Sequence, residues 1–177
     1  MLSLEPSSYL LLLIDFQTRL APAIEGAAAA IDNARRLAEG AALLGATIVA
    51  TEQNPEKLGP TTPELAGRAA RTVSKMSFDA SAAPGFPTDL LEGRPIIVAG
   101  FEAHVCVLQT VLALLAEGRQ VFVAADAVGS RRAENKAAAL HRMERYGAEI
   151  VTTEMVLFEW LGSAEHPHFR DISRLVK

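Results

Sequence analysis

Three residues of this sequence could together perform nucleophilic catalysis. Asp15 comes directly after an apolar run, Lys75 follows a short β-branched segment, and Cys106 lies a few residues beyond another apolar run. A cysteine thiol is a nucleophile, a carboxylate can accept and return its proton, and a nearby ammonium group stabilises negative charge. These residue types therefore indicate covalent chemistry at a carbonyl carbon, provided that the fold brings them together.

Each of these residues also has an ordinary structural interpretation. Asp15 could cap a helix or a turn, Lys75 could be a solvated surface lysine, and Cys106, the only cysteine, could be a small inert core residue. The position of Cys106 at the start of an expected helix keeps a chemical role open beside the inert one, because unpaired N–H groups and partial positive charge there lower a thiol pKa and can receive an oxyanion. His104 lies two residues earlier and points elsewhere, so we expect it to line a pocket or cap the helix.

The pattern of the chain predicts the elements that would position these residues. Strands are expected at 9–14, 46–51, 72–73, 94–100, 120–124 and 148–151, and helices at 24–44, 105–117 and 132–146. This alternation with short connections predicts a parallel sheet covered by helices on both faces. Ligands bind beyond the carboxyl ends of such strands, which is where Asp15, Lys75 and Cys106 lie.

One long irregular segment interrupts this pattern. Residues 52–65 are rich in proline and glycine, and a loop of that length is usually functional or mobile. We expect this segment and residues 78–86 to form a variable wall of a substrate pocket. His166 and His168 form a lone H-x-H pair, which is a weak metal signal, so a structural role is favoured over a metal site.

Composition limits the class of protein. The chain has 177 residues, half of them hydrophobic, which is typical of one domain spanning 1–177. The net charge of −4 disfavours nucleic acid as a partner. The apolar run at 9–14 is too short to cross a membrane and lacks the basic region of a signal peptide, so we expect no membrane association. A lone unpaired thiol fits the reducing cytoplasm.

The motifs around the three candidate residues resemble those of the isochorismatase-like cysteine hydrolase superfamily. They are Leu-Leu-Ile-Asp15-Phe16-Gln17, Ser-Lys75-Met-Ser-Phe78 and Gly100-Phe-Glu-Ala-His-Val-Cys106-Val. The resemblance covers nearly the whole chain, and Glu52-Gln53 after the second expected strand is similar to the small isochorismatase-domain branch. It implies a three-layer α/β/α sandwich around a six-stranded parallel sheet, usually in a homo-oligomer, here expected to be a dimer or tetramer.

The resemblance also implies roles for individual residues. Asp15, Lys75 and Cys106 would form the catalytic triad. A non-proline cis peptide between Phe101 and Glu102 would turn the Glu102 amide toward the same point as the Cys106 amide, and the two would form the oxyanion hole. The residues expected to line the substrate pocket are Phe16, Gln17, Gln53, Phe78 and His104.

Departures from relatives narrow the expected reaction. The metal-binding Asp-x-His…His pattern of the nicotinamidase branch is missing after the second strand, so we expect neither a metal nor another cofactor. Cys106 argues against the vinyl ether cleavage of isochorismatases that lack the cysteine. N-carbamoyl amide hydrolysis stays open, with Arg19 and Arg131 as the candidate cations for a substrate carboxylate.

The sequence therefore predicts a metal-independent cysteine hydrolase. It would cleave a C–N bond of the amide type in a small molecule through a covalent thioester on Cys106. The alternative is a non-catalytic or redox-sensing binding module on the same fold, in which Cys106 would be an oxidation sensor.

Overall fold

The computed structural model describes residues 6–91 and 93–177, and it contains the predicted parallel sheet. Six strands lie in the order β3-β2-β1-β4-β5-β6, and every neighbouring pair is parallel. The strands are β1 (Leu10–Ile14), β2 (Thr47–Gln53), β3 (Arg71–Lys75), β4 (Ile96–Phe101), β5 (Val121–Gly129) and β6 (Glu149–Val151). The prediction of an α/β fold with six parallel strands is confirmed.

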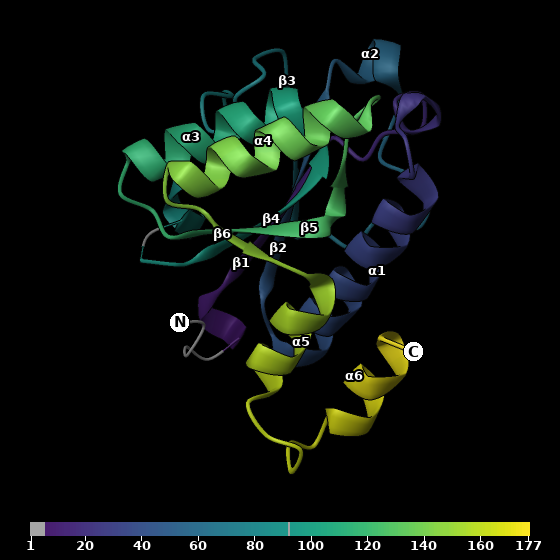
Figure 1. Cartoon of the computed structure of the whole chain (residues 1–177), viewed down its shortest axis with the longest axis vertical. Helices are drawn as coiled ribbons and strands as arrows, with labels where there is room; N and C mark the ends of the chain where they lie inside the picture. The colour runs from purple at the N-terminus through teal and green to yellow at the C-terminus, as the bar shows by residue number, and fades with distance from the viewer. Residues whose placement is uncertain (1–5, 92) are drawn as a thin grey trace.

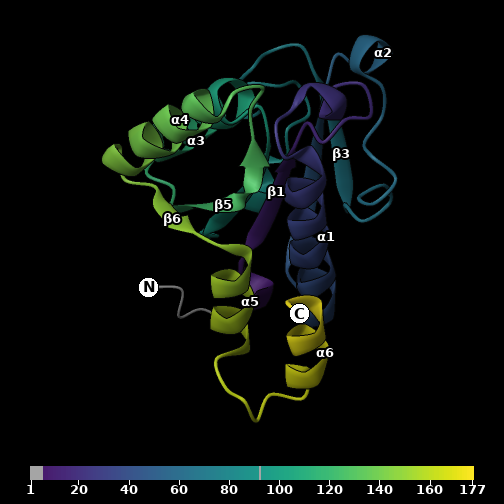
Figure 2. The ribbon, with the colours of Figure 1, turned by 45° about the vertical axis from the view of Figure 1, so that its right-hand side comes forward.

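Helices cover both faces of the sheet, as the three-layer prediction requires. Helices α3 (Leu108–Ala116) and α4 (Ala133–Arg145) lie on one face, and α1 (Ala27–Leu44), α5 (Thr153–Leu161) and α6 (Phe169–Leu175) lie on the other (Figures 1 and 2). Strand β1 is buried on both sides, with Leu11 and Leu13 in the α1 core and Leu10 and Leu12 in the α3 core. A central strand buried on both faces must be apolar throughout, which explains its run of leucines.

The observed element boundaries differ from the predicted ones at several points. Helix α1 begins at Ala27, because residues 21–23 form a separate 3-10 turn that contains a proline, and it ends at Gly45 in the left-handed conformation as predicted. Helices α5 and α6 were not predicted. Both are short, and α5 is apolar on most sides (TEMVLFEWL), so it has little helical periodicity to detect.

Strand β5 is longer than the predicted segment 120–124. Its pairing with β4 shifts after Val98, so that Gly100 and Phe101 pair with Val128 and Gly129. Asp126 lies inside β5, and its carboxylate accepts hydrogen bonds from the backbone and side chain of Thr153. This irregular pairing places residues 129–131 beside the end of β4.

The segment 52–65 is more ordered than predicted. Its first two residues belong to β2, and α2 (Pro55–Leu58) follows. Backbone bonds from Thr18 and Arg19 reach Pro60 and Leu58, and the Arg19 guanidinium donates to two carbonyl oxygens of α2. The segment is therefore fixed against the chain that follows β1.

Among the described residues, no helix is long and apolar enough to span a bilayer. The predicted single domain over 1–177 includes residues 1–5 and 92, which lie outside the described part of the chain.

Candidate active site

Asp15 lies at the end of β1 and is held by its neighbour on β2. Its side chain is completely buried, and its backbone has a left-handed φ of 52°. The Asp15 N–H donates to the Thr51 carbonyl oxygen at 3.1 Å, and the Thr51 hydroxyl donates to Asp15 Oδ1 at 2.7 Å. No helix begins at Asp15, so the helix-cap interpretation does not apply.

Lys75 ends β3 and reaches across β2 to Asp15. Its Nζ lies 2.7 Å from Asp15 Oδ2, and both side chains are fully buried. The ammonium group also donates to Gln53 Oε1 at 2.8 Å and to the carbonyl oxygens of Ser77 and Phe78 at 3.3 and 3.5 Å. A buried ion pair persists only when its remaining protons and lone pairs are satisfied, and here Gln53 and the following loop satisfy those of the lysine. The surface-lysine interpretation is therefore excluded.

Gly100 allows β4 to approach β1 closely at the site. A Cβ atom at this position would lie 2.4 Å from the carbonyl oxygen of Ile14, so only glycine fits. Ile14 and Gly100 are direct partners in the sheet, and each is the last or nearly the last residue of its strand. The segment that carries the cysteine therefore starts beside the backbone that carries Asp15.

Cys106 lies in a π-helical turn, η4 (Ala103–Val107), before α3 begins at Leu108. Its side chain is 6% exposed. Burial, followed by the charge of Asp15, raises the pKa of the Cys106 thiol to about 12, and Lys75 opposes this rise without cancelling it. The prediction that the helix start would lower this pKa is wrong, because burial and a neighbouring carboxylate outweigh the lysine. The Cys106 side chain is therefore a neutral thiol at neutral pH.

The arrangement is therefore suited to general-base activation rather than to a preformed thiolate. Asp15 and Lys75 form an ion pair without net charge. Hydrogen bonding with Asp15 raises the pKa of the Cys106 thiol, and hydrogen bonding with Lys75 lowers it. A proton that leaves the thiol as it attacks can pass to the Asp15 carboxylate. The structure thus brings Asp15, Lys75 and Cys106 together, while their catalytic roles stay a prediction.

The segment before the cysteine contains the cis peptide that the resemblance implied, between Phe101 and Glu102. Within the described chain, no protein group accepts a hydrogen bond from the Glu102 N–H. The Glu102 carboxylate is occupied, since it accepts from Arg131 Nε at 2.9 Å. The oxyanion hole of the Glu102 and Cys106 amides stays a prediction.

Two of the five predicted pocket residues are core residues in this structure. Phe16 is 1% exposed, and its ring packs against Phe101 with centroids 4.6 Å apart. Gln17 is fully buried and bonds to the backbone of Gln53 and to the Gly59 carbonyl oxygen. Neither side chain can touch a substrate without leaving these partners.

The other three predicted pocket residues are at least partly exposed. Gln53 bonds to Lys75 and, through Nε2, to the Met76 carbonyl oxygen. Phe78 is 51% exposed in the loop after β3. His104 is half-buried, and its Nδ1 lies 3.0 Å from the Ser130 hydroxyl. Gln53 and Phe78 surround Lys75, whereas His104 lies on the Cys106 segment.

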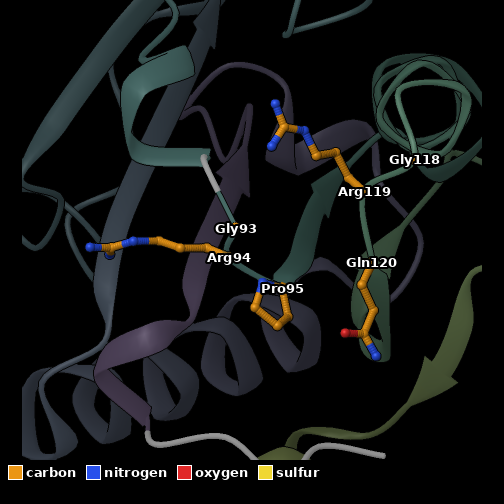
Figure 3. A pocket seen from close by; sticks show the side chains of 6 residues that line it. All are labelled: Gly93, Arg94, Pro95, Gly118, Arg119 and Gln120. Carbon is orange, nitrogen blue, oxygen red and sulfur yellow. The ribbon is translucent and has the colours of Figure 1, made fainter.

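Two of the hollows in the described structure lie at opposite ends of the sheet. One of about 330 Å³ lies beside Lys75 and is lined by the end of β3, the loop 76–84 and Pro55. Figure 3 shows another of about 220 Å³ between residues 93–95 and 118–120, at the amino ends of β4 and β5. The second lies at the opposite end of the sheet from Asp15, and its Arg94 donates to the Thr47 hydroxyl.

No group of three or more His, Cys, Asp or Glu residues within 6–91 and 93–177 is arranged to hold a metal ion. The Glu52 carboxylate, at the position of the nicotinamidase metal pattern, accepts hydrogen bonds from the backbone and hydroxyl of Thr61. The His168 backbone N–H donates to His166 Nδ1, and His168 Nδ1 lies 3.4 Å from Asp171 Oδ2.

Thr51 is the site residue that the sequence did not reveal. The predicted strand 46–51 ends at Thr51, and a threonine there is typical of any β-strand. The available signal was register, because the residue of β2 paired with the last residue of β1 must lie beside Asp15.

Comparisons with known proteins agree with this geometry. A model of the Isochorismatase domain matches residues 9–155. Isochorismatase domain-containing protein 2A of Mus musculus is 38% identical over 176 residues, which are 97% of this chain and 84% of that protein.

Solved structures show the same fold. MAR1 ribonuclease from Caenorhabditis elegans superimposes with a TM-score of 0.92 at 33% identity, over 98% of this chain and 91% of that chain. YcaC from Escherichia coli, described as an octameric hydrolase of unknown specificity, matches with a TM-score of 0.84 over 99% of this chain and 95% of that chain. At 22% identity, the second likeness concerns the fold alone.

Proposed function

The chain belongs to the isochorismatase domain family of hydrolases, and from this premise we propose that it is a cysteine hydrolase that cleaves a C–N bond of a small amide. The observation that carries the proposal is the buried Asp15–Lys75 ion pair beside the only cysteine of the chain. A buried ion pair with no function adds little stability, whereas beside a thiol it supplies a fixed base and a compensating cation.

The first half of the proposed reaction forms a thioester. Cys106 Sγ attacks the amide carbonyl carbon while its proton passes to Asp15, and the carbonyl oxygen becomes an oxyanion that the Glu102 and Cys106 amides receive. The C–N bond then breaks, Asp15 gives the proton to the leaving nitrogen, and an amine or ammonia departs. Lys75 keeps its protons throughout and compensates the negative charge of the Asp15 carboxylate whenever that group is ionised.

The second half restores the enzyme. A water molecule gives its proton to Asp15 and attacks the thioester carbonyl, and a second oxyanion forms at the same amides. The C–S bond breaks, the proton returns from Asp15 to the sulfur, and a carboxylic acid is released. No atom outside substrate, water and these residues is required.

The cations near the site support an uncharged substrate rather than an N-carbamoyl acid. Arg131 is paired with Glu102, Lys75 with Asp15, and Arg19 with the carbonyl oxygens of α2. A substrate carboxylate would have to share a cation with one of these acceptors, which weakens its attraction to that cation.

The direct test is to trap the covalent intermediate. The protein is incubated with a set of small primary and secondary amides, quenched with acid, and weighed intact, with Cys106→Ala as the matched control. We expect an acyl mass increase and amine release in the wild type and neither in the variant. Full turnover by Cys106→Ala would refute the cysteine mechanism.

An RNA substrate is the second candidate, because the Caenorhabditis elegans relative is named a ribonuclease. The net charge of −4 and the pairing of the cations around Cys106 favour the amide over a polyanion. The test of the second candidate is to incubate a labelled RNA with the wild type and with Cys106→Ala. Equal degradation of the RNA by both proteins excludes Cys106 as the cause. The absence of degradation by both proteins excludes the ribonuclease activity.

The redox-sensor alternative has less support. Sensor cysteines are accessible and have lowered pKa values, whereas Cys106 is 6% exposed and its pKa is raised to about 12. Stable oxidation of Cys106 by dilute peroxide, without hydrolysis of any amide in the set, would favour the sensor.

We also propose that the chain forms a homo-oligomer in the cytoplasm. The octameric state described for YcaC supports oligomerisation, as do the apolar side chains of Met76 and Phe78, which are 71% and 51% exposed. Light scattering coupled to size exclusion gives the number of subunits; a monomer at micromolar concentration would contradict the proposal.

A further inference from the structure

Strand β2 contributes no member of the Asp15–Lys75–Cys106 set, yet it lies between the strands that carry Asp15 and Lys75. Thr51 and Gln53 are two residues apart on β2, so their side chains point to the same face. Thr51 donates to Asp15, and Gln53 accepts from Lys75. Each charged residue therefore has its own neutral partner on the intervening strand.

Thr51 holds Asp15 at two points. Its carbonyl oxygen accepts from the Asp15 N–H and its hydroxyl donates to Asp15 Oδ1, at 3.1 and 2.7 Å. The hydroxyl is 1% exposed with the rest of the residue, so water does not compete for this bond. Lys75 holds the other oxygen, and together these donors fix the plane of the carboxylate.

We propose that Thr51 is the positioning residue for the general base, and that its hydroxyl fixes the Asp15 carboxylate in the orientation that receives a proton from the thiol or from water. This inference rests on the proposed cysteine hydrolase function. With the hydroxyl removed, Oδ1 loses its donor and the carboxylate can rotate about the bond to its Cβ. Misplacement by about 1 Å can slow a step by about a hundredfold.

The test uses 4-nitrophenyl acetate, whose leaving group needs no proton. Acetylation of Cys106 releases 4-nitrophenolate in a burst, and the slower steady state reports attack by water, which needs Asp15 as the base. The variants are Thr51→Val, which keeps the volume, and Thr51→Ser, which keeps the hydroxyl. The matched control is Thr153→Val, which removes another buried hydroxyl that donates to a carboxylate, that of Asp126.

In Thr51→Val we expect deacetylation to slow by about 10- to 100-fold, so that acetyl-Cys106 persists correspondingly longer in the intact mass after the ester is removed. Because a donated hydrogen bond favours the ionised carboxylate, the acid limb of the deacetylation rate should also move to higher pH. In Thr51→Ser and Thr153→Val, the deacetylation rate should stay within a few fold of the wild-type rate. The acid limb of the rate should stay at the wild-type pH.

The outcomes separate this inference from the function on which it rests. If wild-type Cys106 is acetylated and Thr51→Val deacetylates as fast as Thr153→Val, the positioning role is refuted and the hydrolase proposal stands. An equal loss of rate in Thr51→Val and Thr51→Ser, with no movement of the acid limb, would reduce Thr51 to a packing residue. If wild type and Cys106→Ala release 4-nitrophenolate equally and no acetyl-protein forms, the proposed function itself fails.

Discussion

Removal of the Asp15 charge should make Cys106 more reactive toward a simple electrophile, even though it should abolish hydrolysis. The negative charge of Asp15 raises the pKa of the thiol, and Lys75 lowers it. Asp15→Asn should therefore increase the fraction of thiolate at a given pH, and Lys75→Met should decrease it. Both variants should lose turnover, because one lacks the base and the other leaves that base without its cation.

The magnitudes follow from the raised pKa. At pH 8, a thiol pKa of about 12 leaves about 10⁻⁴ of the sulfur ionised, against about one tenth for the ordinary value of 9.0. Two neighbouring unit charges interact with an energy of about 4 kcal/mol at an effective dielectric constant of about 20. This energy corresponds to a change of about three units in the pKa of the thiol, as an upper limit. We therefore expect Asp15→Asn to react at least tenfold faster than the wild type, and Lys75→Met at least tenfold slower.

The assay is the rate of iodoacetamide labelling between pH 6 and 10, measured by intact mass. Because the chain has one cysteine, every adduct reports Cys106. The wild type unfolded in urea supplies the rate of the same thiol without its environment. Circular dichroism must show that each variant is folded, since loss of one member of a buried ion pair costs about 3–5 kcal/mol. Slower labelling of folded Asp15→Asn would refute the conclusion that the resting thiol is suppressed by its base.

Three further predictions concern stability. The folded-state pKa of Cys106 lies above its ordinary value of 9.0, so between pH 9 and about 12 the folded chain retains a proton that the unfolded chain loses. The free energy of unfolding should therefore fall in this range by up to about 1.4 kcal/mol per pH unit. Urea titrations of Cys106→Ala should lack this part of the pH dependence. Gly100→Ala, whose Cβ would lie 2.4 Å from the Ile14 oxygen, should destabilise the fold by about 2 kcal/mol more than Gly118→Ala, whose Cβ meets nothing within 4 Å; equal midpoints in urea would contradict the close approach. Gln17→Leu should cost about 2–3 kcal/mol and speed amide hydrogen exchange after β2, because the bonds to this segment are lost; unchanged exchange would show that the segment is held by other contacts.

The strands that precede Asp15 and Cys106 could be predicted because a central strand of a covered parallel sheet is visible in the sequence as a short apolar segment. A strand buried on both faces must be apolar, so the position of Asp15 after β1 is visible without any knowledge of the fold. The same pattern places Cys106 beyond β4. The contact between Asp15 and Lys75 depends on strand order, which was not predicted, and the expectation that the two residues meet came from the resemblance rather than from the residues alone.

The features that escaped prediction depend on packing between distant segments. The pKa of Cys106 is set by burial, which a helix-start argument does not contain. Gln17 looked like a pocket residue because it follows Asp15, but the backbone of Gln53 and Gly59 satisfies its amide group. The roles of Thr51 and Gln53 follow from register with β1 and β3, which no local pattern specifies.

The sheet also separates the chemistry of this site from its specificity. Asp15 and the segment that leads to Cys106 follow paired strands, and the spacing of paired strands is about 4.8 Å in any sheet, so β1 and β4 bring the carboxylate and this segment close together. Gly100 keeps that approach close, and Thr51 holds the carboxylate from the other side. The loop after β3 carries the exposed Phe78, whose backbone carbonyl oxygen, like that of Ser77, accepts from Lys75. Because this bond involves the backbone of Phe78 and not its ring, substitutions of the Phe78 side chain should alter the preferred amide and leave the iodoacetamide reactivity of Cys106 unchanged.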